Sequence, residues 1–387
     1  MVNVAYTHDA MNPFNYVGPV PPAELVDRED EASRLLDLAQ GGHTTRLAAP
    51  RRYGKTSLLL KVLADARDEG LQTVYVDFYR AVTVAEATRR IEEAYLRNLA
   101  GPLRRVAESV VRSWRVRARA APGGVGGEIE LSGSRGHEAH LADVLDLPVR
   151  IFKRSGVRTL VVFDEFQDFL RVQGEIDGLI RSKIQFHRDE AAYLFAGSEP
   201  GLLTALFEER SRPFFQQARP IDLDPLPDGP LGDHIAARFE ASGRDPGEAL
   251  GVLLDLVRGH PQRAMMLAHH LWEATGPRGT ADAATLAAAI DAVDREAGEG
   301  FAYAWQGMAN TPNQRRVLLA LAQGDASLFS GRTLEAFGLT KGGAQAGLRG
   351  LVARGDVQGM PGGRPAIVDP LLERWARRRL GDQGPLE

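Results

Sequence analysis

The segment from Ala49 to Thr56, with the sequence APRRYGKT, restricts the possible folds of this chain more than any other segment. It fits the phosphate-loop pattern G-x-x-x-x-G-K-[ST], with alanine at the first position. A strand-like stretch precedes it at 44–48, and a helical stretch follows from Ser57. In such a loop the backbone N–H groups converge on one point, and the following helix N-terminus adds partial positive charge. The pattern therefore predicts a nucleotide-phosphate site between a strand and a helix.

Individual residues of this loop have predictable roles. Lys55 is expected to reach the β- and γ-phosphates, and the Thr56 hydroxyl is expected to ligate Mg²⁺. The alternative is an ordinary turn before an amphipathic helix, but the strand on one side and the helix on the other favour the phosphate site. The residues of this segment predicted to contact the cofactor are Pro50, Arg51, Arg52, Tyr53, Gly54, Lys55, Thr56 and Ser57.

A second motif, LVVFDE at 160–165, supports this prediction. It is a short apolar run that ends in two carboxylates, which is typical of a buried parallel strand. Asp164 is expected to hold Mg²⁺ through water, and Glu165 to act as the general base on the attacking water. Taken alone, the run could be a strand entering a helix N-terminus, where acidic residues are favoured anyway. Downstream of a phosphate loop, it predicts an ATP or GTP site.

Composition narrows the class of protein further. With 387 residues the chain is expected to contain two or three domains, and 44% hydrophobic and 25% charged residues are typical of a soluble globular protein. The absence of cysteine excludes disulfides, thiolate metal sites and a cysteine nucleophile. No apolar run is long enough for a membrane span and no signal peptide is recognisable, so a cytoplasmic location is expected. The net charge of −4 is unevenly distributed along the chain, because residues 310–387 carry a net charge of +4.

The order of strand-like and helical stretches predicts an α/β fold. Strands are expected at 44–48, 71–78, 160–164, 192–196 and 221–223, with helices between them. This alternation predicts a parallel five-stranded sheet with helices on both faces, in a P-loop ATPase core at 1–226. One strand lies between the two nucleotide motifs and a glutamate follows the aspartate. These features favour an ATPase with a glutamate base over a kinase or a simple GTPase.

Residues 114–132 interrupt this pattern and are predicted to form an inserted hairpin. Arg115, Arg117 and Arg119 alternate, so they would lie on one face of a strand. The hairpin could then be a basic finger for DNA or a neighbouring subunit. Alternatively, Glu128 and Glu130 on the return strand neutralise the arginines as cross-strand pairs; the sequence favours this second interpretation.

Two further domains are predicted after the core. Residues 227–309 are helical throughout and are expected to form a lid beside the nucleotide. In residues 310–387, Thr311-Pro312 starts a helix that ends at Gly324, a short helix follows, and Thr340 caps a third helix that ends at Gly355. A two-stranded wing is then expected at 357–368. Three helices and a wing predict a winged helix, whose third helix usually enters the DNA major groove.

The DNA-binding residues predicted for this domain are Lys341, Gln345 and Arg349 on the third helix and Arg364 in the wing. The alternative is a winged helix that docks on protein, either a partner or its own ATPase domain. Few of these side chains are good base readers, and Gly342, Gly343 and Gly347 are expected to weaken the third helix.

The motifs in this order resemble those of the archaeal-type ATPase family, a branch of the AAA+/STAND P-loop ATPases. The resemblance extends from about Asn12 to Trp375. Its markers are Asn12-Pro13-Phe14, Asp27-Arg28-Glu29, Pro50–Thr56, Phe163-Asp164-Glu165-Phe166-Gln167, Gly197-Ser198, Gly259-His260-Pro261 and Val368-Asp369-Pro370. It implies an ATP- and Mg²⁺-dependent switch, with a homo-oligomer or a protein partner among the possibilities.

The resemblance also implies roles for residues outside the two motifs. Ser198 falls at the polar sensor position for the γ-phosphate, or it caps a helix. Phe14 or Tyr16 would contact adenine, and Pro261 would pack near it. Arg263 lies where a lid arginine touches phosphate, unless it is solvated. Either Arg210 or Arg212 falls where such ATPases supply an arginine in trans to a neighbour, although Arg212 could equally be a surface residue.

Three hypotheses follow from the sequence. The leading one is an ATP-hydrolysing molecular switch whose winged helix contacts double-stranded DNA. The second is a nucleotide-gated DNA-binding regulator with little turnover. The third is an initiator or helicase-loader role, since such proteins share the AAA+ and winged-helix layout.

Overall fold

The computed structural model describes residues 11–120, 134–170, 176–324, 327–358 and 364–383. Contacts divide the chain into two compact units, each described by itself below. Unit 1 contains Met1–Val20, Arg52–Gly54 and Asp224–Glu387, and unit 2 contains Pro21–Arg51 and Lys55–Leu223. The boundary after Leu223 is close to the predicted end of the core at 226. The predicted division between 227–309 and 310–387 lies inside unit 1 and remains a prediction.

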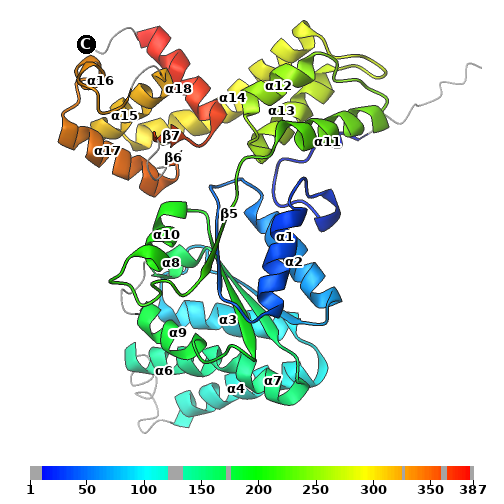
Figure 1. The fold of residues 1–387 in the computed structure, drawn as a ribbon, viewed down its shortest axis with the longest axis vertical. Helices are drawn as coiled ribbons and strands as arrows, with labels where there is room; N and C mark the ends of the chain where they lie inside the picture. The colour runs from blue at the N-terminus through cyan, green and yellow to red at the C-terminus, as the bar shows by residue number, and fades with distance from the viewer. Residues whose placement is uncertain (1–10, 121–133, 171–175, 325–326, 359–363, 384–387) are drawn as a thin grey trace, which may run out of the picture. The chain divides into compact units, whose positions relative to one another are not determined.

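Unit 2 contains a five-stranded parallel sheet, in the order β2-β3-β4-β1-β5. The strands are β1 (Thr45–Ala48), β2 (Gln72–Asp77), β3 (Thr159–Asp164), β4 (Ala191–Gly197) and β5 (Arg219–Asp222). In Figure 1, α1 and α2 lie on one side of the sheet, and α8 and α10 on the other. The predicted α/β P-loop fold, with its five parallel strands, is confirmed.

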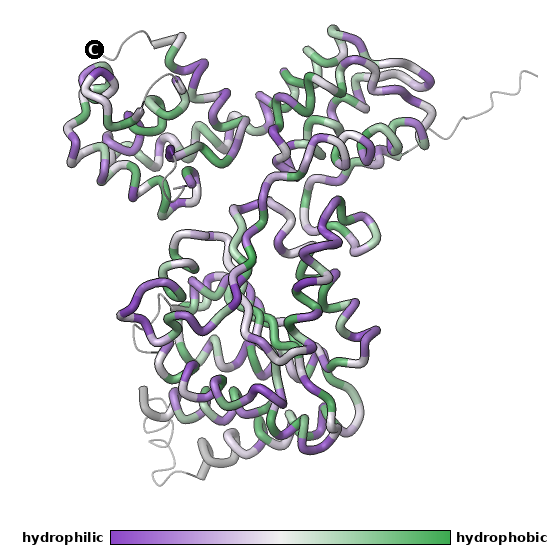
Figure 2. The backbone as a smooth tube through the Cα atoms, viewed as in Figure 1, coloured by the Kyte–Doolittle hydropathy of each residue, from purple (hydrophilic) through white to green (hydrophobic). Residues whose placement is uncertain are grey.

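The helices of unit 2 connect these strands and cover the sheet. They are η1 (Pro22–Glu24), α1 (Glu29–Gln40), α2 (Lys55–Asp68), α3 (Val84–Asn98), α4 (Gly101–Ala120), α6 (Ser134–Leu145), α7 (Leu147–Ser155), α8 (Phe166–Leu170), α9 (Ile176–Ile184) and α10 (Pro200–Glu208). Every residue of β3 and β4 is buried, because helices cover both faces. Figure 2 shows the hydrophobic residues concentrated along these strands. The core is strongly aromatic and includes Phe78, Phe163, Phe166, Phe169, Phe195, Phe207 and Phe214.

The predicted hairpin at 114–132 is wrong over its first arm. Helix α4 continues to Ala120, so Arg115, Arg117 and Arg119 lie in a helix and not on one strand face. The predicted tip and return strand, with Glu128 and Glu130, lie outside the described residues. Three alternating arginines are too few to establish a strand period, and the alanines and arginines of this segment are good helix formers.

Unit 1 is largely helical. Its helices are α11 (Asp228–Ala241), α12 (Ala249–Val257), α13 (Pro261–Ala274), α14 (Ala283–Gly307), α15 (Pro312–Gln323), α16 (Gly331–Ala336), α17 (Lys341–Arg354) and α18 (Pro370–Gln383). Strands β6 (Val357–Gln358) and β7 (Ala366–Ile367) pair antiparallel. The predicted helix ends at Gly324 and Gly355 are confirmed, and both glycines adopt left-handed backbone. Elements α15 to β7 thus have the order predicted for a winged helix.

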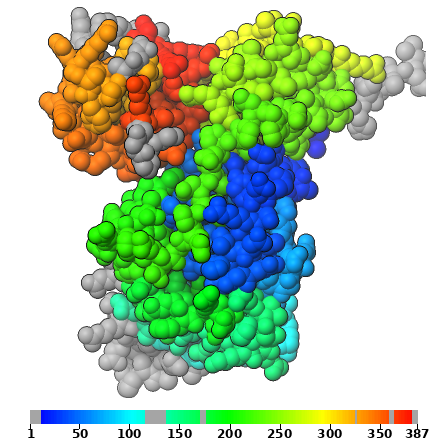
Figure 3. Space-filling view, in the orientation of Figure 1, coloured from blue at the N-terminus to red at the C-terminus, as the bar shows by residue number. Residues whose placement is uncertain are grey.

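Helix α18 was not predicted, and it packs on both the α11–α14 and α15–β7 regions of unit 1. It contacts α12, α14, α15 and β7. The Trp375 ring lies 5.7 Å from that of Trp305 and 6.3 Å from that of Phe301, both on α14. Arg378 and Arg374 pair with Asp294 on the same helix. Figure 3 shows α18 (red) against α14 (yellow).

Three glycines of α17 have a packing role that the sequence did not reveal. A Cβ atom at Gly347 would lie 2.5 Å from the carbonyl oxygen of Asn313, and one at Gly350 would lie 2.2 Å from the side chain of Gln314. At Gly343 the distance to Asn313 would be 3.0 Å. These glycines allow α15 to approach α17 closely. Their weaker helix propensity is therefore offset by helix–helix packing.

Candidate functional site

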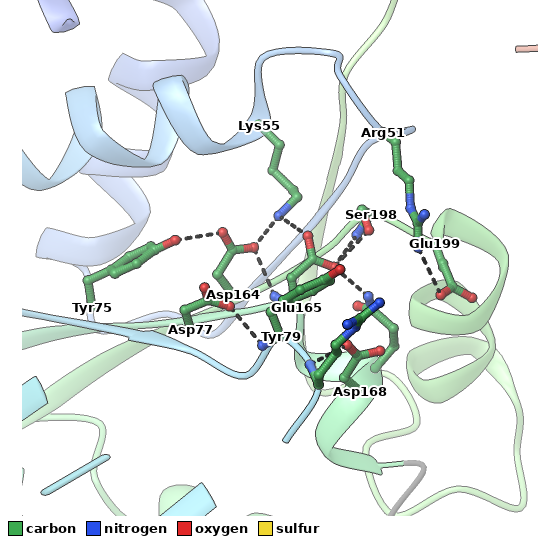
Figure 4. Close-up of polar contacts among 12 residues, drawn as sticks. Arg51, Lys55, Tyr75, Asp77, Tyr79, Asp164, Glu165, Asp168, Ser198 and Glu199 are labelled. Atoms are coloured by element: carbon green, nitrogen blue, oxygen red, sulfur yellow. Dashed lines mark hydrogen bonds and ion pairs between the residues drawn. The ribbon is translucent and has the colours of Figure 1, made fainter. Parts of the chain in front are cut away.

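Lys55 joins the two predicted nucleotide motifs within unit 2. It is the first residue of α2, and its Nζ contacts Asp164 Oδ1 and lies 3.1 Å from Glu165 Oε1 (Figure 4). Lys55 and Asp164 are only 5% and 2% exposed. The three residues come together because β3 and β1 are separated only by β4, so their carboxyl ends lie at the same edge of the sheet.

Glu165 has an uncommon backbone conformation. Its φ is +51°, in the left-handed region that side chains other than glycine, asparagine and aspartate rarely adopt. The cause is local, because β3 ends at Asp164 and α8 begins at Phe166, leaving one residue for the turn. The backbone is held by hydrogen bonds from Glu165 N to Asp164 Oδ1 (2.9 Å) and from Asp168 N to Glu165 O (3.0 Å). Strain of this kind is common at functional sites.

Two further side chains bind the Glu165 carboxylate. Ser198, the residue after β4, donates from Oγ to Glu165 Oε2 at 2.7 Å. Gln167 donates from Nε2 to the same oxygen at 2.5 Å. Burial alone would raise the pKa of Glu165, but the Lys55 charge and the bonds from Ser198 and Gln167 outweigh it, so its pKa is lowered. Glu165 is therefore an ionised carboxylate, as a general base must be.

Asp164 is held from its other side by Tyr75 on β2. The Tyr75 hydroxyl donates to Asp164 Oδ2 at 2.8 Å (Figure 4). Burial and the nearby Asp164 charge raise the pKa of Tyr75 well above its ordinary value, so the hydroxyl keeps its proton and remains a donor. No sequence motif indicated a role for Tyr75. The only signal was its place on the strand next to β3, facing the motif.

The phosphate loop has the backbone expected of an anion-binding turn. Arg52 and Gly54 have φ values of +69° and +82°. Left-handed residues in such a turn direct consecutive N–H groups to one side. A Cβ atom at Gly54 would meet nothing within 4 Å, so this glycine is needed for its dihedral and not for space. Arg51 is exposed and lies 3.9 Å from the buried Glu199, the residue after Ser198.

The donors at this site fit Mg²⁺ held together with a nucleotide. Thr56, on the first turn of α2, offers a hydroxyl, and Asp164 offers carboxylate oxygens. Mg²⁺ prefers oxygen ligands and usually takes only one or two from protein, the rest coming from phosphates and water. Within the described ranges no group of three or more His, Cys, Asp and Glu residues could hold a metal by itself.

Predicted adenine contacts lie in unit 1. Phe14 is 2% exposed, and its ring packs 5.3 Å from that of Phe239 in α11. His269 in α13 binds the Phe14 carbonyl oxygen through Nδ1 at 2.8 Å. The segment around Phe14 is thus anchored to α11 and α13. Pro261 is the first residue of α13, and its contact with adenine remains a prediction.

Gly259 and His260 explain the Gly-x-Pro motif before α13. Gly259 has a φ of +71°, and a Cβ atom there would lie 2.2 Å from the Leu226 carbonyl oxygen. His260 caps α13 by accepting from Arg263 N, and burial lowers its pKa to about 4. Also within unit 1, the His260 ring lies 4.9 Å from the Tyr53 ring.

Arg263, the predicted phosphate-contacting lid residue, is bound to another residue of unit 1. It is 3% exposed, and its Nη2 lies 2.5 Å from Asp369 Oδ2, just before α18. Its Nε lies 3.0 Å from the same oxygen. In this structure its guanidinium stabilises unit 1, and contact with phosphate remains a prediction.

Two arginines follow α10. Arg212 is ion-paired within its own chain, 3.7 Å from Asp177 and 3.6 Å from Glu209. Arg210 is exposed. Action of either residue in trans remains a prediction.

The predicted DNA-binding residues share one property. Each is solvent-exposed, three of them on α17 and one before β7: Lys341, Gln345, Arg349 and Arg364. Thr340 caps α17 by accepting from Gly343 N at 3.0 Å, as predicted.

None of the described helices has both the length and the apolar character needed to cross a bilayer.

Comparisons with known proteins support these assignments of fold. Residues 23–116 match a family described as an AAA-like domain. A search of curated proteins found no match. A solved Walker-type ATPase of Pyrococcus abyssi is similar with a TM-score of 0.67 and 17% identity, over 94% of this chain and 99% of that chain. ORC2 of Aeropyrum pernix, solved as ADPNP–ADP complexes, has a TM-score of 0.57 and 16% identity, with coverages of 95% and 98%. At identities this low the comparisons show a shared fold, so the predicted resemblance to archaeal-type AAA+ ATPases is confirmed at the level of the fold.

Proposed function

For a chain with an AAA-like domain and the fold of archaeal-type AAA+ ATPases, we propose Mg²⁺-dependent ATP hydrolysis that drives a molecular switch. The observation that carries the proposal is the buried group formed by Lys55, Asp164, Glu165 and Ser198 next to the phosphate loop. Lys55 and Asp164 lie 109 residues apart in the sequence. An ordinary structural strand end would not need a buried lysine shared by two carboxylates.

Glu165 is the general base in this proposal. Its lowered pKa keeps it ionised, and Ser198 fixes one of its oxygens. It takes a proton from the attacking water, a step in which a positioned base typically contributes about 10²–10⁴-fold. Because Ser198 touches this carboxylate directly, a change at the γ-phosphate sensed by Ser198 would reach Glu165 without an intermediate residue.

Lys55 and Asp164 prepare the site for the charged nucleotide. The Lys55 ammonium is paired with two carboxylates, and we assign it to the β- and γ-phosphates when ATP is bound. Thr56 and Asp164 would hold Mg²⁺, which supplies charge neutralisation on the phosphates. Tyr75 keeps Asp164 oriented by donating to Oδ2. Phe14 and Pro261 are assigned to adenine, and Arg263 to phosphate.

The winged-helix region is assigned to duplex DNA. Lys341, Gln345 and Arg349 are exposed on the third helix, where winged helices usually read the major groove, and Arg364 is exposed before β7. Phosphate contacts by such residues would make binding salt-dependent. Hydrolysis would then change how this region holds its partner.

A nucleotide-gated regulator or an initiator-like protein with little turnover is the second candidate. It is favoured by the shared fold with ORC2 of Aeropyrum pernix. This candidate has the same nucleotide residues but predicts no catalytic cycle.

The first test is steady-state ATP hydrolysis by the wild type and Glu165→Gln, with and without duplex DNA. We expect Glu165→Gln to lower kcat by about 10²-fold or more while ATP still binds. Glu93→Gln, an exposed glutamate on α3, is the matched control and should retain wild-type turnover. Lys55→Ala should lose ATP affinity, and unchanged affinity would refute the site. No wild-type turnover with ATP bound would favour the regulator.

The second test measures DNA affinity against salt concentration. Arg349→Ala should lower the slope of log K against log[salt] by about 0.9 if this side chain contacts one phosphate. Lys153→Ala on α7, also exposed, is the control and should leave the slope unchanged. Equal slopes for both variants would refute DNA contact through α17.

A further inference from the structure

Gln167 is a buried residue of α8, and its side-chain amide has a hydrogen-bond partner at only one end among the described residues. It is 4% exposed. Its Nε2 donates to Glu165 Oε2 at 2.5 Å, while its Oε1 is buried without a hydrogen-bond partner among the described residues. A buried carbonyl oxygen without a partner is unfavourable. The hydrogen bond from the other end of the amide, Nε2, to Glu165 therefore maintains this arrangement.

Gly197 provides the space for this amide. A Cβ atom at Gly197 would lie 2.4 Å from Gln167 Oε1 and 3.4 Å from its Cδ. Gly197 is the last residue of β4, a central strand in which every residue is buried. Because glycine has no side chain, another group can approach its backbone closely. Here that group is the Gln167 amide.

The carboxylate of Glu165 fixes the direction of the amide. Rotating the Gln167 amide by half a turn would place its oxygen against Glu165 Oε2, and two acceptors repel. Ser198 Oγ donates to the same carboxylate oxygen, and Lys55 lies 3.1 Å from the other. Gln167 is thus the member of this group that approaches Glu165 from α8, the helix that begins directly after Glu165.

We propose that Gln167 is a positioning residue for the general base: seated in the space left by Gly197, its amide holds the Glu165 carboxylate beside Ser198. This inference rests on the proposed hydrolysis by Glu165. Its consequence is that Gln167 acts on turnover through Glu165 and contributes nothing to ATP affinity.

The first experiment replaces Gln167 by methionine, which has a similar shape but cannot donate. Because a misplacement of about 1 Å can cost about 10²-fold, we expect Gln167→Met to lower kcat by about 10–100-fold. KM and the ATP dissociation constant should stay within about twofold, as expected when only the catalytic step is affected. The control is Gln185→Met, an exposed glutamine after α9 that should behave as wild type.

The second experiment displaces the Gln167 amide without changing Gln167 itself. Gly197→Ala adds one methyl group against Gln167 Oε1 and should also lower kcat. In a Gln167→Ala background the added methyl group no longer meets the amide and faces only Leu203 Cδ2, at 3.3 Å, so Gly197→Ala should lower kcat much less than in the wild type. This non-additivity is the signature of two residues that act through one contact.

Each outcome has a definite meaning. If Glu165→Gln loses turnover but Gln167→Met keeps the wild-type kcat, this inference is overturned and the proposed function stands. If Glu165→Gln retains turnover, the proposed function fails and the inference fails with it. If Gln167→Met weakens ATP binding, or lowers the residual turnover of Glu165→Gln as much as that of the wild type, Gln167 has only a structural role.

Discussion

Removing the guanidinium of Arg263 should destabilise unit 1 by about 3–5 kcal/mol, the usual loss when one partner of a buried ion pair is deleted. Arg263 is 3% exposed, and three of its contacts reach Asp369, at 3.1, 3.0 and 2.5 Å. Burial alone would raise the pKa of Asp369, but the hydrogen bonds and charge of Arg263 lower it. Arg263→Met would therefore leave a partly buried carboxylate, 18% exposed, without its cation.

The assay is thermal unfolding of the full chain followed by tryptophan fluorescence. Three of the four tryptophans, Trp272, Trp305 and Trp375, lie in unit 1, so the signal reports mainly on that unit. A unit of this size loses about 2–4 °C of Tm per kcal/mol. Arg263→Met should therefore lower Tm by about 6–12 °C for a loss of 3 kcal/mol.

Two further variants make the measurement decisive. Asp369→Asn in the Arg263→Met background removes the stranded charge and should recover most of the loss, whereas Asp369→Asn alone should be costly. Arg258→Met is the matched control, because its side chain is 52% exposed although it pairs with Glu373. It should cost at most about 1 kcal/mol. If Arg263→Met is no worse than Arg258→Met, the buried pair does not exist, and Arg263 would be available for phosphate.

Three other predictions concern single sites. Without nucleotide or metal, Lys55→Met should lower the free energy of unfolding by about 3 kcal/mol, because it leaves the buried Asp164 carboxylate without its cation. The measurement is urea unfolding, and a free energy equal to that of the wild type would contradict the buried pairing. Gly259→Ala should cost more than about 1 kcal/mol, since its φ is +71° and Leu226 leaves no room, whereas Gly251→Ala in α12, with open space, should not destabilise. The pKa of His260 is about 4 when folded and 6.5 when unfolded, so the unfolded chain binds the proton first as pH falls. Stability should drop by up to about 3 kcal/mol between pH 6.5 and 4, and His260→Asn, which keeps the cap, should reduce that drop; equal drops would refute the buried neutral histidine.

The sheet and the nucleotide motifs were predictable because their signals are local. A run of β-branched or apolar residues predicts a strand, and parallel strands necessarily bring their carboxyl ends to the same edge of the sheet. Lys55 and Asp164 therefore meet although 109 residues separate them. The same rule explains why Ser198 lies beside Glu165, since β4 is the neighbour of β3, although this contact was not predicted.

The remaining parts of the site depend on tertiary packing that no short pattern records. Gln167 belongs to a recognised motif, but its role depends on the absence of a side chain at Gly197, which lies 30 residues away in the sequence and in strand β4. Arg263 has the expected position in α13, yet its partner Asp369 lies 106 residues further on. Helix α18 could have been recognised from Leu371, Leu372, Trp375 and Ala376, which recur at helical spacing.

The discontinuous make-up of unit 1 has a consequence for how the chain matures on the ribosome. Phe14 packs on Phe239, and Asn12 bonds to His269, 257 residues further along. Unit 2 lies between them in the sequence, so it can emerge and fold while the Asn12–Tyr16 segment has nothing to dock on. Translation at about 5–20 residues per second makes that wait many seconds long. Throughout it, the apolar ring of Phe14 lacks the α11 residue on which it packs in the folded chain.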